Sequence, residues 1–511
     1  MKRLIDSEGR YFEHMLSFPL PIGLRRELAD CAAQFYAHNN KHLTRTILWD
    51  LQPYLSSEAL IALEKALPPS EPSPLPEAEA DVLAWFLSEY LSYRQWQANN
   101  GDERGAELVH GLAHAFARWY LERYPFWLLQ PGWISFQHSA QLLDSANDFV
   151  TLCVILDGLP VWDAQDLASA VSAKVKRLDL EQKSYCFAPM PTITQFAKEA
   201  LLKGVPPYLT AESTPLGTIL PDGGSPLQGL MGAQPGDLVF WRVSQPDYAY
   251  HFEGKAKRER QVRAELESII LALKEVIEKL PANLDLQIII TSDHGRLYNP
   301  KSPRSLPVPS GMEAHGRLAW GHLQRDFDEQ GFAVDTDAGQ IAVHGQRFGM
   351  TQDMLIALGE ESFQGDRGGH EPFPHGGLFP EEAIVPWFVF RRDSQRPKLV
   401  IVVRGSGEAE AAGDLTVTIT NPSQMALECI AVSLPHHSAT QTRGQWAIPP
   451  LGKFAFDLRL APWPTKSDLP LQATLLVRQP SGATFTLQTE AMLEVTSLYE
   501  RDDSLLKDLE L

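Results

Sequence analysis

The sequence predicts an α/β protein built on a parallel sheet flanked by helices, with an α-helical N-terminal domain and a C-terminal β-sandwich. Three observations support this fold class. Helical spacing of apolar residues dominates the first part of the chain, apolar runs alternate with helical segments in the middle, and short strand-like runs follow. A chain of 511 residues exceeds one ordinary core. The expected domains are residues 1–135, 136–394 and 395–499, with an acidic tail at 500–511.

The N-terminal domain is expected to be helical because Ser57–Leu67 and Ala80–Trp96 are amphipathic. A proline-rich stretch at 68–76 separates them and cannot continue a helix, so it predicts an extended linker. Aromatic residues crowd the segment 116–133. We expect them to pack a helix layer onto the next domain, with a partner-binding face as the alternative.

The middle domain contains a run from Gln287 to Thr291 that is apolar and β-branched, and this run ends at Ser292-Asp293-His294-Gly295. Such a run predicts a central strand of a parallel sheet that is covered on both faces. A helical pattern at 260–279 precedes it, as in a helix-then-strand crossover. The segment from Tyr298 to Phe348 is irregular and polar.

A carboxylate and an imidazole at the mouth of a buried strand need a partner, and a divalent cation is one. The alternative is a turn with both side chains in water. Other polar clusters lie beside strand candidates: Asp157-Gly158 follows the run 149–156, Asp247 and His251 follow the run 237–243, and His375 precedes the run 384–387. Four clusters in this context favour a shared metal site.

Five motifs follow one another along the chain: Asp157-Gly158, Pro191–Phe196, Asp247 with His251, Asp293-His294-Gly295 and His375-Gly376-Gly377. In this order they resemble the alkaline phosphatase superfamily, and most closely its PglZ branch. The Pro-Thr-x-Thr segment and the His-Gly-Gly, Glu-Glu and Val-Pro series are typical of that branch. The resemblance covers about residues 149–390.

The resemblance implies an alkaline-phosphatase-like fold that holds two divalent ions. Asp157, Asp293 and His294 would bind the first ion together with the nucleophile, and Asp247, His251 and His375 would bind the second. This mixture of oxygen and nitrogen ligands suits zinc, with manganese as the alternative.

The nucleophile is expected to be Thr194, because the second threonine of the corresponding Pro-Thr-Lys-Thr segment has that role in related nucleotide pyrophosphatase/phosphodiesterases. Metal coordination would lower the pKa of its hydroxyl. Thr192 is the other candidate hydroxyl in the segment, and it is also a good N-cap for a helix beginning near Ile193. Both roles are compatible, since a helix N-terminus also accommodates an anion.

The implied activity is that of a metal-dependent phosphodiesterase or phosphatase acting on DNA, RNA or a cyclic oligonucleotide. The PglZ resemblance implies BREX-type anti-phage defence, with protein partners from a defence operon bound by the helical and β-sandwich domains. The alternative is a catalytically silent PglZ-like scaffold. A small-metabolite enzyme of the phosphonopyruvate or phosphoglycerate type would require a serine nucleophile segment, which the sequence lacks.

The formal net charge of −19 argues against an extended duplex-binding surface. A basic run, Lys255–Arg263, is either a solvated helix face or a guide for the phosphodiester. Four scattered cysteines lack disulfide or metal spacing, and Cys153 is expected to be a buried free thiol. The first residues lack an apolar signal core, and no membrane-length apolar run follows, so we expect a cytoplasmic location without a membrane.

After residue 395 six short runs of strand-forming residues recur with turn residues between them, the pattern of an antiparallel immunoglobulin-like sandwich. They carry no catalytic constellation. The runs are Leu399–Val403, Leu415–Ile419, Glu428–Ser433, Lys453–Leu458, Leu471–Val477 and Ala483–Leu487.

Overall fold

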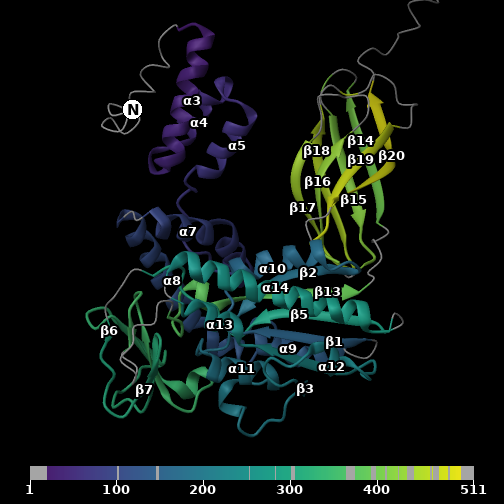
Figure 1. The fold of residues 1–511 in the computed structure, drawn as a ribbon. Helices are drawn as coiled ribbons and strands as arrows, with labels where there is room; N and C mark the ends of the chain where they lie inside the picture. The colour runs from purple at the N-terminus through teal and green to yellow at the C-terminus, as the bar shows by residue number, and fades with distance from the viewer. Residues whose placement is uncertain are drawn as a thin grey trace, which may run out of the picture. The chain divides into compact units, whose positions relative to one another are not determined.

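The computed structural model describes residues 20–100, 103–145, 149–252, 254–281, 284–300, 305–363, 374–392, 399–408, 411, 413–423, 425–433, 442–460, 463, 471–480 and 484–496 (Figure 1). The expected acidic tail at 500–511 lies outside these residues. Internal contacts divide the chain into two compact units. Unit 1 comprises residues 1–125, 297–347 and 352–381, and unit 2 comprises residues 126–296, 348–351 and 382–511. The four domain limits expected from the sequence remain predictions.

The first part of unit 1 is helical, as predicted. Its helices are α3 (Ile22–His38), α4 (Arg45–Leu51), α5 (Ser57–Ala66), α6 (Glu79–Trp85), the π-helical η3 (Phe86–Tyr90), α7 (Leu91–Asn100) and α8 (Glu103–Trp127), with short 3-10 turns η1 (Asn40–His42) and η2 (Gln52–Tyr54). Thr44 and Ser56 cap α4 and α5 by accepting hydrogen bonds from backbone N–H groups. The proline-rich stretch at 68–76 forms no helix, as predicted.

Unit 1 also contains a small antiparallel sheet, so the prediction of an irregular segment at 298–348 is wrong. Its strand order is β7-β8-β11-β10-β9, and a parallel pair, β6 with β12, accompanies it. Strands of two to five residues are too short to show hydrophobic alternation in the sequence. The strands are β6 (Ser305–Leu306), β7 (Glu313–His315), β8 (Leu318–Gly321), β9 (Phe332–Asp335), β10 (Gln340–Val343), β11 (Asp353–Ala357) and β12 (Ser362–Phe363).

The central sheet of unit 2 has the order β2-β13-β5-β1-β4-β3. The predicted strands are present, and every residue of β1 and β5 is buried. The neighbours β5, β1, β4 and β3 pair in parallel, whereas β13 runs antiparallel to both β5 and β2. The sheet is therefore mixed, not wholly parallel. The strands are β1 (Val150–Leu156), β2 (Leu178–Phe187), β3 (Thr218–Ile219), β4 (Leu238–Val243), β5 (Leu286–Ser292) and β13 (Ile384–Arg392).

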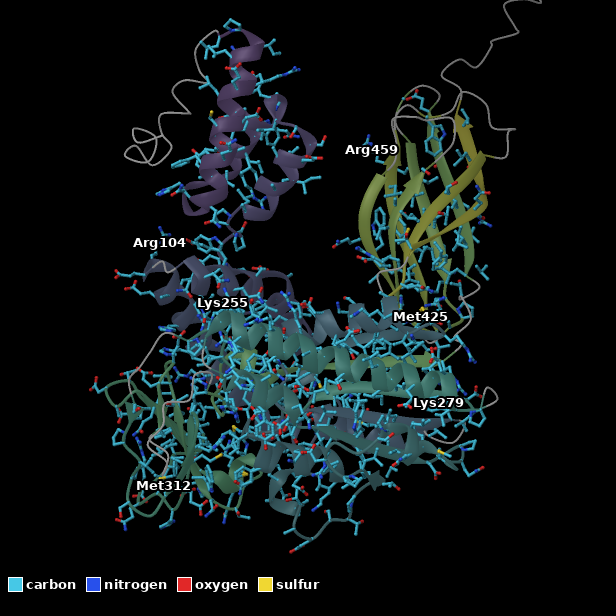
Figure 2. All side chains as sticks on the ribbon, in the orientation of Figure 1. Arg104, Lys255, Lys279, Met312, Met425 and Arg459 are labelled. Carbon is cyan, nitrogen blue, oxygen red and sulfur yellow. The ribbon has the colours of Figure 1, made fainter. Side chains whose placement is uncertain are left out.

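Helices cover both faces of this sheet, with α10 and α14 on one side and α9 and α11 on the other (Figure 1). Figure 2 labels Lys255 and Lys279, the two ends of α14. Lys257, Arg260 and Arg263 of α14 are exposed, as a solvated face requires. The helices are α9 (Ser135–Ser145), α10 (Val161–Lys174), α11 (Thr194–Lys203), α12 (Pro226–Leu230), α13 (Gln245–Tyr250), α14 (Lys255–Lys279) and α15 (Pro380–Ala383).

Two further expectations concern the whole chain. Cys153 is a buried free thiol, as predicted, and burial raises its pKa to about 12. Among the residues that the structure describes, none of the helices combines the length and apolar character needed to cross a membrane.

The C-terminal strands form one seven-stranded sheet with the order β17-β16-β19-β20-β14-β15-β18. All neighbours pair antiparallel except β14 and β20, which are parallel. The sequence did not predict β17. Trp463 is buried in the core of this sheet. The strands are β14 (Val400–Glu408), β15 (Gly413–Thr420), β16 (Leu427–Ser433), β17 (Thr442–Ile448), β18 (Lys453–Leu460), β19 (Leu471–Arg478) and β20 (Thr484–Thr496).

Candidate metal centre

Two carboxylates meet where the central strands β1 and β5 end. The strands pair in parallel with Leu156 opposite Ser292, so the residues that follow them, Asp157 and Asp293, emerge side by side. The Ser292 hydroxyl accepts a hydrogen bond from the N–H of Leu159 over 2.9 Å and lies 2.7 Å from the carbonyl oxygen of Leu156. This bridge fixes the turn after β1 against the end of β5.

Asp293 is fully buried and only half satisfied. Its Oδ1 accepts hydrogen bonds from the N–H groups of Gly158, at 3.0 Å, and of His294, at 3.1 Å. Its Oδ2 has no hydrogen-bond partner within the described part of the chain. A buried carboxylate oxygen without a donor is costly, and a cation is the partner that such an oxygen accepts.

His294 turns one ring nitrogen toward these carboxylates. Its Nδ1–H donates to the carbonyl oxygen of Gly295 over 2.8 Å, so a neutral ring presents a lone pair at Nε2. That Nε2 lies 3.8 Å from Oδ1 of Asp157 and 3.9 Å from Oδ2 of Asp293. One ligand atom from each of these three residues lies within 4.8 Å of the others. The structure thus brings together the three residues that the sequence analysis named for the first ion, and their role as ligands remains a prediction.

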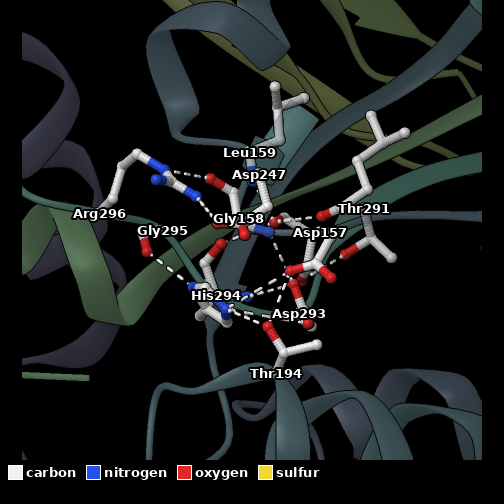
Figure 3. Close-up of polar contacts among 12 residues, drawn as sticks. Asp157, Gly158, Leu159, Thr194, Asp247, Thr291, Asp293, His294, Gly295 and Arg296 are labelled. Atoms are coloured by element: carbon white, nitrogen blue, oxygen red, sulfur yellow. Dashed lines mark hydrogen bonds and ion pairs between the residues drawn. The ribbon is translucent and has the colours of Figure 1, made fainter. Parts of the chain in front are cut away.

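Thr194 brings a hydroxyl to the same place (Figure 3). Its Oγ1 donates to Oδ1 of Asp157 over 2.8 Å and lies 3.0 Å from Nε2 of His294. One hydroxyl proton therefore faces two acceptor atoms, because the proton of the neutral imidazole is already on Nδ1. A cation bound to both acceptor atoms would satisfy them without a proton, and the donor set of two carboxylates, one imidazole and one hydroxyl suits a divalent metal.

The alternative role of Thr192 as a helix cap is wrong. Helix α11 begins at Thr194, its N-cap is Ile193, and no side chain caps it. Thr192 is fully buried. Thr194 is thus the first residue of a ten-residue helix, with its hydroxyl beside the metal cluster.

The pKa of Asp157 is raised to about 7, from an ordinary value of 3.8, first by burial and then by the neighbouring charge of Asp293. The folded, metal-free protein therefore holds this proton more tightly than the unfolded chain. The contribution of this one carboxyl to the stability of the metal-free protein is therefore fully present below pH 4 and is lost as the pH rises through 7.

We expect Asp157→Asn to remove this loss. Relative to wild type, the metal-free variant should gain about 2 kcal/mol more unfolding free energy at pH 8 than at pH 5, a cautious fraction of the three-unit shift at 1.4 kcal/mol per unit. Urea unfolding of both proteins at the two pH values, in the presence of a chelator, measures the difference. An equal gain at both pH values would contradict the raised pKa.

The predicted ligands of the second ion are divided between the two units, with Asp247 and His251 in unit 2 and His375 in unit 1. Asp247, in α13, pairs through Oδ2 with Nε2 of His251 over 3.1 Å. Oδ1 of Asp247 accepts a hydrogen bond from Nη2 of Arg296 over 2.5 Å. His375 belongs to unit 1, where it is buried and its carbonyl oxygen accepts from the N–H of Arg317.

Sequence reasoning missed Arg296, which is fully buried beside the cluster. A signal was present, because an arginine directly follows Asp293-His294-Gly295, at the point where the chain leaves the buried strand. Charged residues at such a point are buried only when they are paired.

Gly158 leaves the space into which Arg296 fits. Its φ is +57°, and a Cβ built there would lie 2.2 Å from Nη2 of Arg296 and 3.1 Å from Cε1 of His294. We expect Gly158→Ala to reduce stability by about 2–3 kcal/mol through this collision. Gly232, with φ +87° and no atom within 4 Å of its Cβ position, is the control. Chemical unfolding should show Gly232→Ala losing only about 1 kcal/mol; equal losses would contradict the collision.

Comparisons with known proteins give limited similarity. No family model matches the chain, and no curated protein matches its sequence. The solved structure of murine ectonucleotide pyrophosphatase/phosphodiesterase 5 is 14% identical, with a TM-score of 0.32 over 47% of this chain and 87% of that chain. The human protein is 12% identical, with a TM-score of 0.31 over 47% and 87%. The ApaA protein from Bordetella pertussis is 15% identical, with a TM-score of 0.16 over 20% and 94%. Similarity at this level assigns neither a family nor an activity.

Proposed function

We propose that this chain is a metal-dependent phosphodiesterase of the alkaline phosphatase superfamily type, with Thr194 as its nucleophile. The observation that carries the proposal is the position of one hydroxyl. Oγ1 of Thr194 lies 2.8 Å from Oδ1 of Asp157 and 3.0 Å from Nε2 of His294, two groups that also belong to the metal-ligand cluster. A hydroxyl that contacts both a carboxylate and an imidazole at the ends of the parallel strands β1 and β5 is placed as a metal-activated nucleophile requires.

Asp157, Asp293 and His294 would hold the ion, zinc by preference and manganese as the alternative. When bound, a divalent ion supplies a Lewis acid that lowers the pKa of the nearby hydroxyl and stabilises charge on phosphoryl oxygens. The buried Oδ2 of Asp293, which lacks a hydrogen-bond partner among the described residues, supports this assignment.

The protein groups orient the reaction. Asp157 accepts the hydrogen bond of the Thr194 hydroxyl and so directs its lone pairs away from the strand end. The N-terminus of α11, whose N-cap residue Ile193 makes no side-chain cap, favours a phosphoryl anion beside Thr194. Oγ1 loses its proton and forms a bond to phosphorus as the ester P–O bond breaks, and the leaving oxygen takes up that proton and departs as an alcohol. Water then hydrolyses the phosphothreonine and restores the hydroxyl.

The substrate and context are proposed from the motif order. The PglZ-like series supports a diester in nucleic acid or a cyclic oligonucleotide, and a role in BREX-type anti-phage defence with protein partners on the helical and β-sandwich domains. The net charge of −19 favours a short or single-stranded substrate over an extended duplex. A second ion on Asp247 would have to compete with Arg296, because the carboxylate of Asp247 already pairs with that guanidinium.

Hydrolysis of bis-p-nitrophenyl phosphate tests the proposal. The protein is stripped with a chelator and then assayed with zinc or manganese added back. We expect no activity in the stripped protein, recovery with metal, and slower cleavage of the monoester p-nitrophenyl phosphate. A metal-loaded protein that cleaves neither these compounds nor a panel of DNA, RNA and cyclic oligonucleotides would contradict the proposal and favour the scaffold alternative.

A further inference from the structure

Arg296 is held at three points beside the metal cluster. Its Nε donates to the carbonyl oxygen of Gly158 over 2.8 Å, and its Nη2 donates to Oδ1 of Asp247 over 2.5 Å. Its guanidinium carbon lies 4.1 Å from the centre of the Tyr250 ring, in a cation–π contact. The side chain is fully buried. Leaving this position would break all three contacts, so the positive charge is a fixed part of the site (Figure 3).

The guanidinium of Arg296 pairs with Asp247, the carboxylate that a second ion would need as a ligand. Oδ1 of Asp247 accepts from Arg296, and Oδ2 lies 3.1 Å from Nε2 of His251. A guanidinium stays protonated at every accessible pH. A divalent ion on Asp247 would therefore lie against a fixed positive charge in a partly buried place, where screening by water is weak.

The same guanidinium adjoins the first-ion ligands. The Cβ position of Gly158 is 2.2 Å from Nη2 of Arg296 and 3.1 Å from Cε1 of His294, so these two side chains are neighbours across the glycine. Nη1 of Arg296 has no hydrogen-bond acceptor among the residues that the structure describes. A buried, charged donor without an acceptor is suited to an anionic ligand.

We propose that the site binds one divalent ion per chain and that the guanidinium of Arg296 takes the place of the second ion. An ion held by Asp157, Asp293 and His294 would lower the pKa of the Thr194 hydroxyl, and Arg296 would supply the second positive charge for the phosphoryl group. The inference rests on the proposed function, because only a phosphoryl substrate would need a second positive charge beside the metal ion. It departs from the two ions that the sequence motifs imply.

Metal stoichiometry tests the proposal without an activity assay. Chelator-stripped protein is loaded with excess zinc, freed of unbound metal by gel filtration, and measured by mass spectrometry for zinc per folded chain. We expect one ion in wild type and two in Arg296→Met, which keeps much of the side-chain volume but removes the guanidinium that pairs with Oδ1 of Asp247. Arg296→Lys, which keeps the charge, should bind one. Arg317→Met is the matched control, because Arg317 is also fully buried and lies over an aromatic ring, that of Phe379; it should bind one.

Two ions in wild type would overturn the proposal, and so would no ion, or one ion in both wild type and Arg296→Met. If Arg296→Met does not fold, Arg296→Gln replaces it, and the wild-type value still separates one ion from two. The proposed function fails separately. A chain that binds one ion in wild type and two in Arg296→Met, yet hydrolyses no diester, would keep the metal assignment and lose the phosphodiesterase.

Discussion

Replacing Thr194 with valine is expected to lower metal-dependent diester hydrolysis by about 10³-fold or more, because the variant has no hydroxyl to attack phosphorus. Valine keeps the shape of threonine, so the fold and the metal cluster should persist. The hydroxyl's partners, Asp157 and His294, belong to the cluster itself. Steady-state rates with bis-p-nitrophenyl phosphate, together with zinc content per chain, separate lost chemistry from lost metal.

Two variants control this experiment. Thr194→Ser restores a hydroxyl and should recover most of the activity. Thr192→Val removes the other hydroxyl of the segment and should leave the rate per folded chain within about tenfold of wild type. If Thr192→Val is inactive while Thr194→Val retains activity, the nucleophile has been assigned to the wrong threonine. If both retain activity, a covalent threonine mechanism is excluded.

Replacing Asp293 with asparagine is expected to weaken metal binding by about 100-fold or more and to abolish activity at limiting metal. In the metal-free protein the same change should raise stability by about 1–2 kcal/mol, because it removes one of two adjacent buried carboxylates. Zinc at 100 times its dissociation constant should stabilise wild type by about 2–3 kcal/mol but leave the variant unchanged. Thermal unfolding with and without zinc measures both effects.

Asp353 provides a matched control in unit 1. Its carboxylate also accepts from a backbone N–H, that of Gly345, and pairs with an imidazole, that of His344. The structure groups no metal ligands around it within the described residues. Asp353→Asn should change overall stability without changing the response to zinc. A zinc-induced shift of equal size in Asp293→Asn and wild type would remove Asp293 from the metal site.

Much of the site's framework was predictable because its signals are local. A buried, β-branched strand that ends in a polar pair is visible in a few consecutive residues, and this pattern located the ends of β1, β4 and β5. The short strands β6 to β12 were not predicted, because two to five residues are too few to show alternation. Strand β17 has seven residues, but Arg443, Gly444 and Gln445 interrupt its apolar pattern.

The direction of β13 in the sheet could not be predicted from the local sequence pattern. Its residues predict a strand, but whether that strand lies parallel or antiparallel depends on the path of about 90 residues between β5 and β13, and the register with β5 places Trp387 opposite Thr291. The antiparallel arrangement brings the start of β13 to the edge of the sheet where β1 and β5 end.

The pattern along the chain predicted four strands of the central sheet, β1, β4, β5 and β13, the polar residues beside them and the motif order that suggests a phosphohydrolase, but it did not predict β2 or β3. Only the tertiary structure decided that Thr194 meets Asp157, 37 residues away, and His294, 100 residues away, and that Arg296 pairs with Asp247. The reason is physical: the pattern along a chain reports which side chains are buried, whereas their partners depend on which distant segments the sheet brings together.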